Sequence, residues 1–506
     1  MSTSEPPFDM RDIVYDIGSY QNFLHTTISW DQLQTLISGL TLKSLLPAVA
    51  ILYVCGVASV VFYRLYLHPI SRFPGPRIAA ATGWYQAYYD IVKQGKMTQR
   101  IAKLHEIYGP IVRISPNRLH FSDPEEYSKI YSVNTKFIKD PALYTSFNVN
   151  HSSFGFTDPQ AARGRRAVLN PLFSRRAAID LQWLVVEKFD KLSEKLVEYG
   201  GPSKTVDLLS AFRSVTLDII TAFSFATSFN SLDDKDFGSQ ILVAMEDASG
   251  TSRFAKHFPL LNTILVNSPP IFGSALSPAM GALFEVKRTL KAQIDKLIEN
   301  PEELKGSPHP IIYSRLLDPN VRGADAAPPT RKSLQDEAQV MIFAGSDTVA
   351  LTLVTGLFHV MDNPAVHQKL MAELTQAWPD LGTAPGYEDL EKLPYLVLHP
   401  SNTQYCLNVI HANETKFPKH QDFIPERWQQ ADSKHLENFL VAFSKGSRQC
   451  LGINLAYTEL YIGFASIFRR FEFKLDNTRE DLDWQDSFIS RFTGKNLQGI
   501  VTLRTS

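Results

Sequence analysis

The residue best suited to chemistry in this chain is Cys450, in the stretch FSKGSRQCLG from Phe443 to Gly452. Only two other cysteines occur, Cys55 and Cys406, and the three are widely separated. An odd, scattered set is not a disulfide framework and fits a reducing compartment. No Cys or His accompanies Cys450 at the spacing of a zinc site. The question is therefore what a single thiolate can do in this loop.

The residues around Cys450 suit a flat, anionic macrocycle. Gly446 permits a tight turn, and Gly452 lets the following helix approach a flat partner closely. Arg448 offers a planar fork for carboxylates such as haem propionates. Cys450 stands where a helix starts, so N–H groups and the helix dipole favour its thiolate, and Phe443 can shield the sulfur. A thiolate beneath a haem donates electron density to the iron as its axial ligand. The pattern predicts haem ligation by Cys450; the alternative is a buried structural cysteine.

A second polar cluster interrupts the longest predicted helix. This helix is expected to begin near Ser333, since Ser333 and Asp336 have the spacing of a capping box, and to run to Pro364. Its middle reads AGSDT (Ala344–Thr348), which weakens a helix otherwise rich in Val, Leu and Phe. The cluster is either a kink with solvated polar residues or a notch where a small ligand and water approach the helix backbone.

The elements that must position these residues are mostly helical. Helical periodicity covers Leu181–Gly201 and Met280–Asn300, whereas strand-like runs such as Pro110–Phe121 are few. The apolar stretch His257–Met280, broken by prolines, is either a buried loop or a surface that dips into a membrane. We expect one large, mainly α domain with a minor β part, over residues 81–506.

An apolar segment precedes this domain. Residues 45–63 carry no charge and are long enough to cross a bilayer as a helix, and basic residues follow while acidic residues dominate before. This predicts a transmembrane anchor with a lumenal segment at 1–44 and a cytosolic main domain. A cleaved signal peptide is the alternative, but the segment begins late and lacks a small-residue cleavage site. The proline-rich residues 64–80 are expected to form a stiff hinge.

Composition narrows the class of protein. The 506 residues are 44% hydrophobic and 20% charged, with a formal net charge of −1. A nucleic-acid-binding protein would show a basic excess, so no nucleic acid is expected as a partner.

Taken together, these motifs resemble those of the cytochrome P-450 superfamily along nearly the whole chain. FPGP (Phe73–Pro76), AGSDT and PERW (Pro425–Trp428) match the family pattern, as does the cysteine loop. The stretch around Arg166 is similar to the helix that contacts a haem propionate, although Ala162 stands where the family often has Trp or His. The hinge and cysteine-loop stretches look most like fungal microsomal members of secondary metabolism, of the trichodiene oxygenase type.

The resemblance implies a haem-thiolate monooxygenase. It would insert one oxygen atom of O₂ into an apolar small molecule, such as a terpenoid or polyketide, at the endoplasmic reticulum membrane. Electrons from NADPH would arrive through a cytochrome P-450 reductase, which a basic face at Lys445 and Arg448 could meet; Lys445 could also be an ordinary solvated charge. Thr348 and Asp347 would manage water and protons as catalytic residues. The haem b contacts would be Phe443, Gly446, Arg448, Cys450 (the iron ligand), Gly452, Arg166, Ala344 and Gly345.

Two other functions are compatible with the same residues. One is a haem-thiolate protein without catalysis, or one that never assembles. The other keeps the haem but works without a reductase, as an isomerase or a peroxide-using enzyme would.

One expected part of the family pattern is missing. Family members follow LPYL with a helix carrying Glu-x-x-Arg and then strands, but here Leu390–Pro418 passes almost directly to the next segment, and no Glu-x-x-Arg occurs between Thr348 and Cys450. The Glu285–Arg288 pair lies in the wrong place and is predicted to be a surface pair. Arg427 would therefore lack its buried carboxylate partner. We expect a chain shortened in its core, as from a mispredicted gene, rather than a harmless loop deletion.

Overall fold

The structure is a computed structural model that describes residues 42–201, 203–304, 306–322, 328–397, 408–430 and 433–504. It divides into two compact units, Met1–Ser71 and Arg72–Ser506. Each unit is described by itself.

The first unit contains the predicted membrane segment. Helix α3 (Leu42–Phe62) continues into a wider turn over Tyr63–Leu67. Leu45–Leu67 is long and apolar enough to cross a membrane, and none of it is buried. A helix that is apolar all round and leaves its side chains uncovered needs an apolar surrounding.

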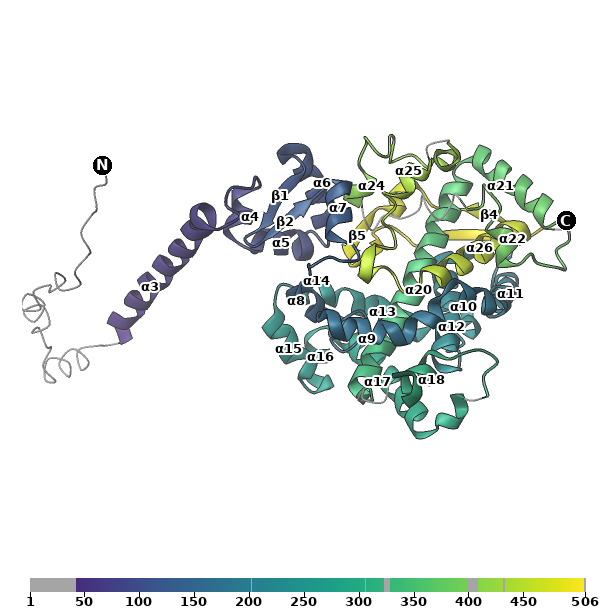
Figure 1. Ribbon diagram of the computed structural model, residues 1–506, viewed down its shortest axis with the longest axis horizontal. Coiled ribbons are helices and arrows are strands. Elements are labelled where there is room, and N and C mark those ends of the chain that lie inside the picture. Colours follow the sequence, from purple (N-terminus) through teal and green to yellow (C-terminus); the bar gives the residue numbers. More distant parts are fainter. Residues whose placement is uncertain are drawn as a thin grey trace, which may run out of the picture. The chain divides into compact units, whose positions relative to one another are not determined.

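The second unit is mainly helical, as expected (Figure 1). Its longer helices are α6 (Met97–Tyr108), α9 (Pro159–Leu169), α11 (Gln182–Tyr199), α12 (Leu208–Phe225), α13 (Gln240–Ser249), α17 (Pro278–Glu299), α20 (Arg331–Met361), α21 (Pro364–Ala377) and α26 (Ile453–Arg470). Its shorter helices are α4 (Arg77–Ala81), α5 (Trp84–Ala87), α7 (Pro124–Ile130), α8 (Pro141–Tyr144), α10 (Arg175–Asp180), α14 (Thr251–Ala255), α15 (Pro259–Asn267), α16 (Pro270–Leu276), α18 (Ile312–Leu317), α19 (Pro319–Arg322), α22 (Tyr387–Leu390), α24 (Asn408–His411) and α25 (Ser433–Glu437).

Helix α20 forms the centre of this unit, packed against α12 and α26 (Figure 1). Both α12 and α20 are also long and apolar enough to cross a membrane, but 94% and 67% of their apolar windows are buried inside the protein. Their apolar residues therefore serve the core, and α20 carries the predicted AGSDT cluster through its middle.

The start of α20 differs from the prediction. Thr330 is the N-cap residue, and its hydroxyl accepts a hydrogen bond from the Ser333 amide. Ser333 and Asp336 lie inside the helix and are used for tertiary contacts instead: the Ser333 hydroxyl donates to the carbonyl of His151, and Asp336 accepts from the His151 amide. The capping-box prediction was wrong because both side chains bind a loop that is distant in sequence.

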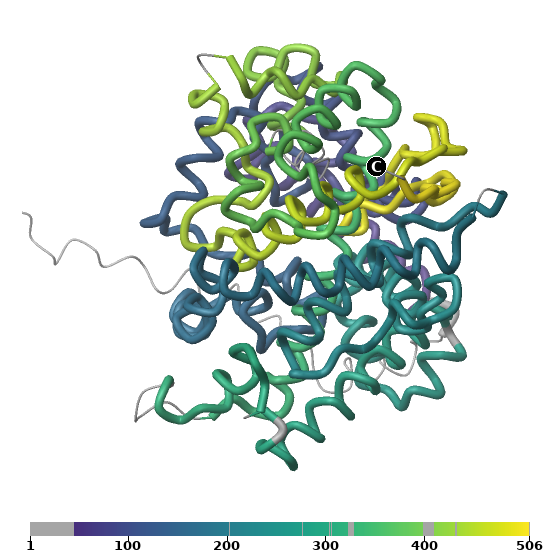
Figure 2. The backbone as a smooth tube through the Cα atoms, turned by 90° about the vertical axis from the view of Figure 1, so that its right-hand side faces the viewer, coloured from purple at the N-terminus to yellow at the C-terminus, as the bar shows by residue number. Residues whose placement is uncertain are grey.

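The β structure is minor and antiparallel. β1 (Ile111–Ser115) pairs with β2 (Arg118–Phe121), and both lie within the predicted strand-like run Pro110–Phe121. β3 (Thr205–Asp207), β7 (Gln498–Leu503) and β4 (Phe471–Leu475) form one sheet with β7 in the middle. Figure 2 shows the C-terminal segment, in yellow, beside the segment that leads into β3. β5 (Trp484–Ser487) and β6 (Ile489–Phe492) form a hairpin.

The proline-broken stretch His257–Met280 folds as short helices rather than as a buried loop. Pro259, Pro270 and Pro278 each stand in the first turn of α15, α16 and α17, where a missing N–H costs nothing. Several large side chains of α15 and α16 are exposed, among them Leu260 and Ile271.

Part of the predicted hinge belongs to the second unit. The carbonyl of Pro74 accepts a hydrogen bond of 2.7 Å from the Arg113 amide on β1. A Cβ at Gly75 would lie 2.3 Å from the Arg113 carbonyl oxygen, so only glycine allows this approach. The FPGP motif therefore packs against β1.

A buried ion pair ties α9 to α20. Glu337 has no solvent exposure, pairs with Arg165 at 2.5 Å and accepts from the Ser153 amide at 2.9 Å. By contrast, Glu285 and Arg288 form an exposed pair on α17, as predicted.

We expect Glu337→Ala to lower the free energy of unfolding by about 3–5 kcal/mol, because Arg165 then stays buried without its partner. Urea unfolding measures this. Glu285→Ala is the control and should leave the unfolding midpoint unchanged, and equal effects of the two changes would contradict the proposed importance of burial.

Candidate functional site

The cysteine loop is held in shape by its own backbone. The Cys450 amide donates to the carbonyl of Phe443 at 2.8 Å, and Gln449 donates to Gly446 at 3.1 Å. Gly446 has a φ of +69°, and a Cβ there would lie 2.0 Å from the Tyr131 carbonyl oxygen. Glycine is required at this position for both reasons. Gly446 thus supports the loop from behind.

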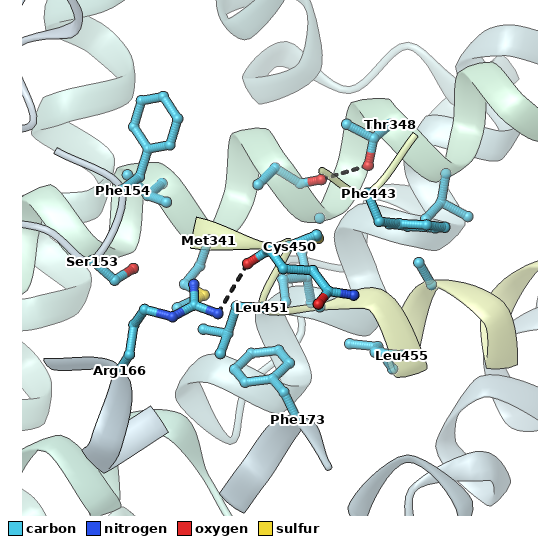
Figure 3. A pocket seen from close by; sticks show the side chains of 18 of the residues that line it. Ser153, Phe154, Arg166, Phe173, Met341, Thr348, Phe443, Cys450, Leu451 and Leu455 are labelled. Atoms are coloured by element: carbon cyan, nitrogen blue, oxygen red, sulfur yellow. Dashed lines mark hydrogen bonds between the residues drawn. The ribbon is translucent and has the colours of Figure 1, made fainter. Parts of the chain in front are cut away.

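The loop opens onto a cavity of about 950 Å³ between α9, α20 and α26 (Figure 3). Eight of the predicted site residues line it: Arg166, Ala344, Gly345, Thr348, Phe443, Arg448, Cys450 and Gly452. Gly446 and Asp347 do not. Residues from distant parts of the sequence therefore meet around one thiol, as the motifs indicated.

Cys450 is an exposed free cysteine, and it lines this cavity. Burial raises the pKa of the thiol, while the Gly452 amide and the charge of Arg166 act to lower it. From the sequence, the start of the helix was expected to favour the thiolate. The Gly452 amide and Arg166 do favour it, but the opposing effect of burial is larger in the protein without a ligand, so the pKa of the thiol is raised. A cation bound at the sulfur would reverse this balance.

Gly452 is the cap of α26, and a Cβ there would meet nothing within 4 Å. The open space beside it belongs to the cavity. Phe443 contributes another wall and packs against Tyr457, with ring centroids 5.1 Å apart. The loop therefore leaves open space close to the thiol.

Three cations gather at this cavity. Arg166 donates to the carbonyl of Gln449 at 2.9 Å, and Arg448 donates to the carbonyl of Phe156 at 3.1 Å (Figure 3 shows Arg166). Lys139 donates to the carbonyl of Phe154, and burial together with the two arginines lowers its pKa to about 7. None of the three forms an ion pair with a described carboxylate. An anionic ligand with two carboxylates, such as haem, fits this set.

The one acidic residue that lines this cavity does not balance these charges. Burial raises the pKa of Glu459 well above its ordinary value, which favours the neutral form of its carboxyl. Its Oε2 has no hydrogen-bond partner among the described residues. The cavity is therefore electropositive.

Sequence reasoning missed Lys139. The residue belongs to no motif, and it reaches the site through a loop that precedes α9. Ala162, where the family often has Trp or His, is buried, and its methyl side chain has no hydrogen-bond donor for a ligand. Lys139 supplies a cation on the same cavity.

The AGSDT cluster leaves α20 unbroken. The Thr348 hydroxyl donates to the carbonyl of Ala344 at 2.8 Å, and that of Ser346 donates to Ile342 at 2.6 Å. A Cβ at Gly345 would lie 2.6 Å from the Ile220 side chain, so this glycine allows α12 and α20 to approach each other. Thr348 and Ala344 are exposed toward the cavity. The helix therefore runs continuously through the cluster, which combines helix packing with one hydroxyl that faces the site.

Asp347 points away from the cavity. Its carboxylate is fully buried between Arg213 of α12 and Arg491 of β6, with N–O distances of 2.7 Å to each. Burial by itself would raise the pKa of Asp347, but the two arginines hold it below its ordinary value. Arg213 also pairs with Glu246 of α13 at 2.7 Å. In this position Asp347 links α20 to α12 and β6.

Arg427 is buried without an ion-pair partner in the part of the chain that the structure describes. Its guanidinium donates to the carbonyl of Lys419 at 3.3 Å, and burial lowers its pKa. Lys445 donates to the carbonyl of Asn438. The centre of the junction that the sequence analysis singled out, residues 398–407, lies outside the described residues.

Comparisons with known proteins agree with this site. The chain matches the family model Cytochrome P450 over residues 76–398 and 401–497. It is 32% identical to the cytochrome P450 monooxygenase sdnE of Sordaria araneosa, over 86% of this chain and 93% of the relative. It is 33% identical to the tryptophan 6-hydroxylase fscE of Fusarium equiseti, over 85% and 91%, and 33% identical to the cytochrome P450 monooxygenase tpcC of Cochliobolus heterostrophus, over 85% and 88%. A thiol facing an electropositive cavity, a mainly helical fold and these matches confirm the predicted family, and the chain belongs to the cytochrome P450 family.

Proposed function

We propose that this protein is a haem-thiolate monooxygenase that oxidises an apolar small molecule in secondary metabolism. The observation that carries the proposal is the Cys450 thiol at the floor of a cavity lined by Lys139, Arg166 and Arg448. Bound haem would supply reductive activation of O₂, with one oxygen atom entering the substrate and the other leaving as water. The names of the fungal relatives support the reaction class.

The chain's own residues would divide the remaining work. Arg166, Arg448 and Lys139 would hold the carboxylates of the cofactor through charge-assisted hydrogen bonds. Cys450 would bind its iron. Thr348 would hold a water and pass a proton at its Oγ1, since this hydroxyl faces the cavity. Asp347 would act through the placement of Thr348, and any direct proton transfer by it requires release from its two arginines.

The membrane and the electron donor complete the proposal. Leu45–Leu67 supports a single anchor in the endoplasmic reticulum membrane, with 1–44 lumenal, 64–80 as hinge and the domain at 81–506 cytosolic. A membrane-bound reductase using NADPH would meet the face that bears the cysteine loop. Reductase-independent turnover would instead favour the isomerase or peroxide-using alternative.

A second candidate is a shortened protein that binds haem poorly. The family match breaks between residues 398 and 401, at the predicted junction. The alignment with sdnE is 488 positions long, but it includes only 86% of the 506 residues of this chain. The alignment is therefore longer than the part of this chain that it contains, and several tens of sdnE positions stand opposite gaps in this chain. Arg427 supports the same inference, because it is buried and has no ion-pair partner among the described residues, whereas a buried charge needs a partner.

Cys450→Ser tests the iron ligand. We expect the reduced protein with carbon monoxide to lose the Soret band typical of thiolate ligation, because a hydroxyl is a poor soft donor. Cys55→Ser, in the first unit, is the matched control and should keep the band. A Cys450→Ser protein with an unchanged band would refute the assignment.

Thr348→Ala tests the hydroxyl that faces the cavity. Haem content should be unchanged, because alanine maintains the helix, while product per NADPH falls about tenfold or more and peroxide is released. Thr355→Ala is the control, since Thr355 makes the same back-bond to a helix carbonyl but does not line the cavity. Full coupling in Thr348→Ala would exclude a proton-transfer role.

Restoring the missing segment tests the second candidate. We expect the 506-residue chain to bind haem substoichiometrically, and a chain with the corresponding segment of sdnE inserted at residues 399–400 to bind it fully and turn over with reductase. A glycine- and serine-rich insert of equal length serves as control. Stoichiometric haem and normal turnover of the chain without an insert would contradict the deletion hypothesis.

A further inference from the structure

A second cavity of about 880 Å³ adjoins the first along α20. The two cavities share Phe154, Val340, Ala344 and Thr348. The remaining walls come from the loop before α9, the end of α13, α14, α17 and the β5–β6 turn. A molecule in this cavity would therefore lie against the residues nearest the proposed site of oxidation.

One wall is built of three phenyl rings in edge-to-face contact. Phe147 lies 5.4 Å from Phe154 and 4.6 Å from Phe488, and Phe154 lies 5.5 Å from Phe488, between ring centroids. Phe488 has a φ of +73° in the tight turn between β5 and β6, a strained conformation for a bulky residue. This turn brings its half-exposed ring to the cavity. Such a wall suits flat, apolar ring systems.

No charged side chain lines this second cavity among the described residues. A carboxylate or ammonium group that entered it would lose its hydration without gaining a counter-ion, which is costly. The electropositive cavity next to it differs sharply, with its two arginines and one lysine. The lining therefore selects an uncharged ligand.

Most polar groups on the wall are already bonded within the protein. The hydroxyls of Ser146, Thr251 and Ser252 donate to the backbone carbonyls of residues 143, 248 and 249. Asn148 and Asn262 exchange hydrogen bonds between their side-chain amides, at 3.2 and 3.4 Å. These groups offer little to a ligand.

Gln339 of α20 is the exception. It is 9% exposed, lines the cavity and forms no side-chain hydrogen bond with a described residue. The Oγ of Ser487 also has no partner, but that atom is itself buried. No atom of the Gln339 amide is among the fully buried atoms without a partner, so the amide remains open to the cavity and a ligand group can form a hydrogen bond with it.

We propose that the substrate is an uncharged, flat, mostly apolar ring compound with one neutral hydrogen-bonding group, such as a carbonyl, that binds the side-chain amide of Gln339. This rests on the proposed function, since it assigns the substrate class of that site. Gln339 and Thr348 are separated by nine residues, roughly 13 Å along the helix axis. The polar group therefore lies at the end of the molecule far from the carbon that is oxidised. A free amino acid, with two charges, is excluded.

Equilibrium dialysis of the haem-loaded chain with three probes of the same shape tests this: 4-acetylbiphenyl, biphenyl and biphenyl-4-carboxylate. We expect the ketone to bind about two- to tenfold more tightly than biphenyl, and the carboxylate at least about tenfold more weakly than the ketone. Gln339→Leu should bring the ketone and biphenyl to equal affinity. Gln368→Leu, at an exposed site on α21, is the matched control and should keep the preference.

Three results would overturn the inference: no measurable ketone binding, tighter binding of the carboxylate, or an unchanged ketone preference in Gln339→Leu. The probe comparison on the unchanged chain stands even if the variant misfolds. The carbon monoxide spectrum of the same samples separates the two proposals. A chain without the thiolate band that still ranks the probes as expected refutes the monooxygenase function alone, whereas a chain with the band and the wrong ranking refutes the substrate class alone.

Discussion

The buried carboxylate of Asp347 is the contact on which the arrangement of the site depends. Arg213 and Arg491 hold it on the side of α20 that faces α12 and β6. Successive residues on a helix point about 100° apart, so fixing Asp347 in this direction turns Thr348 toward the cavity. Desolvation offsets much of the attraction in such a cluster, and its main effect is to specify orientation. The same two arginines connect α20 to α13 and to the hairpin that carries Phe488. Both cavities thus take their shape from one ionic cluster.

A second electrostatic constraint operates on the other side of the helix. Lys139, Arg166 and Arg448 lie at one cavity, and burial raises the pKa of Glu459, the one acidic residue among its described lining residues. Burial lowers the pKa of each of them, and repulsion by neighbouring arginines adds to this effect for Lys139 and Arg166. An anionic group bound there relieves this repulsion and restores the charged form of Lys139. The protein therefore separates two chemistries along one helix: a charged cavity beside the thiol and an uncharged cavity beyond Phe154.

Compact local motifs were enough to find residues that meet at one cavity. Cys450, Arg448, Gly452 and Thr348 were predicted from local patterns, and the structure brings them to one cavity. Prediction was insufficient where partners come from distant segments. Nothing in the local sequence connects Asp347 with Arg491, or places Lys139 and Phe488 on cavity walls. The helix start illustrates the same limit: the spacing of Ser333 and Asp336 matched a capping box, but both side chains bind the loop at His151.

The packing also shows where a shortened chain would be weak. The central contacts among α12, α20 and α26 involve none of the residues at the junction, and Glu337, Arg165 and the Asp347 cluster are complete. Arg427, in contrast, stands between the junction and the cysteine loop, buried and without an ion-pair partner among the described residues. If a segment is missing at the junction, its cost would fall on the support of the cysteine loop and not on the helical core. Such a chain would keep its helices and its uncharged cavity while holding Cys450 less firmly. In a shortened chain, loss of the thiolate ligand and loss of the fold would for this reason be separable.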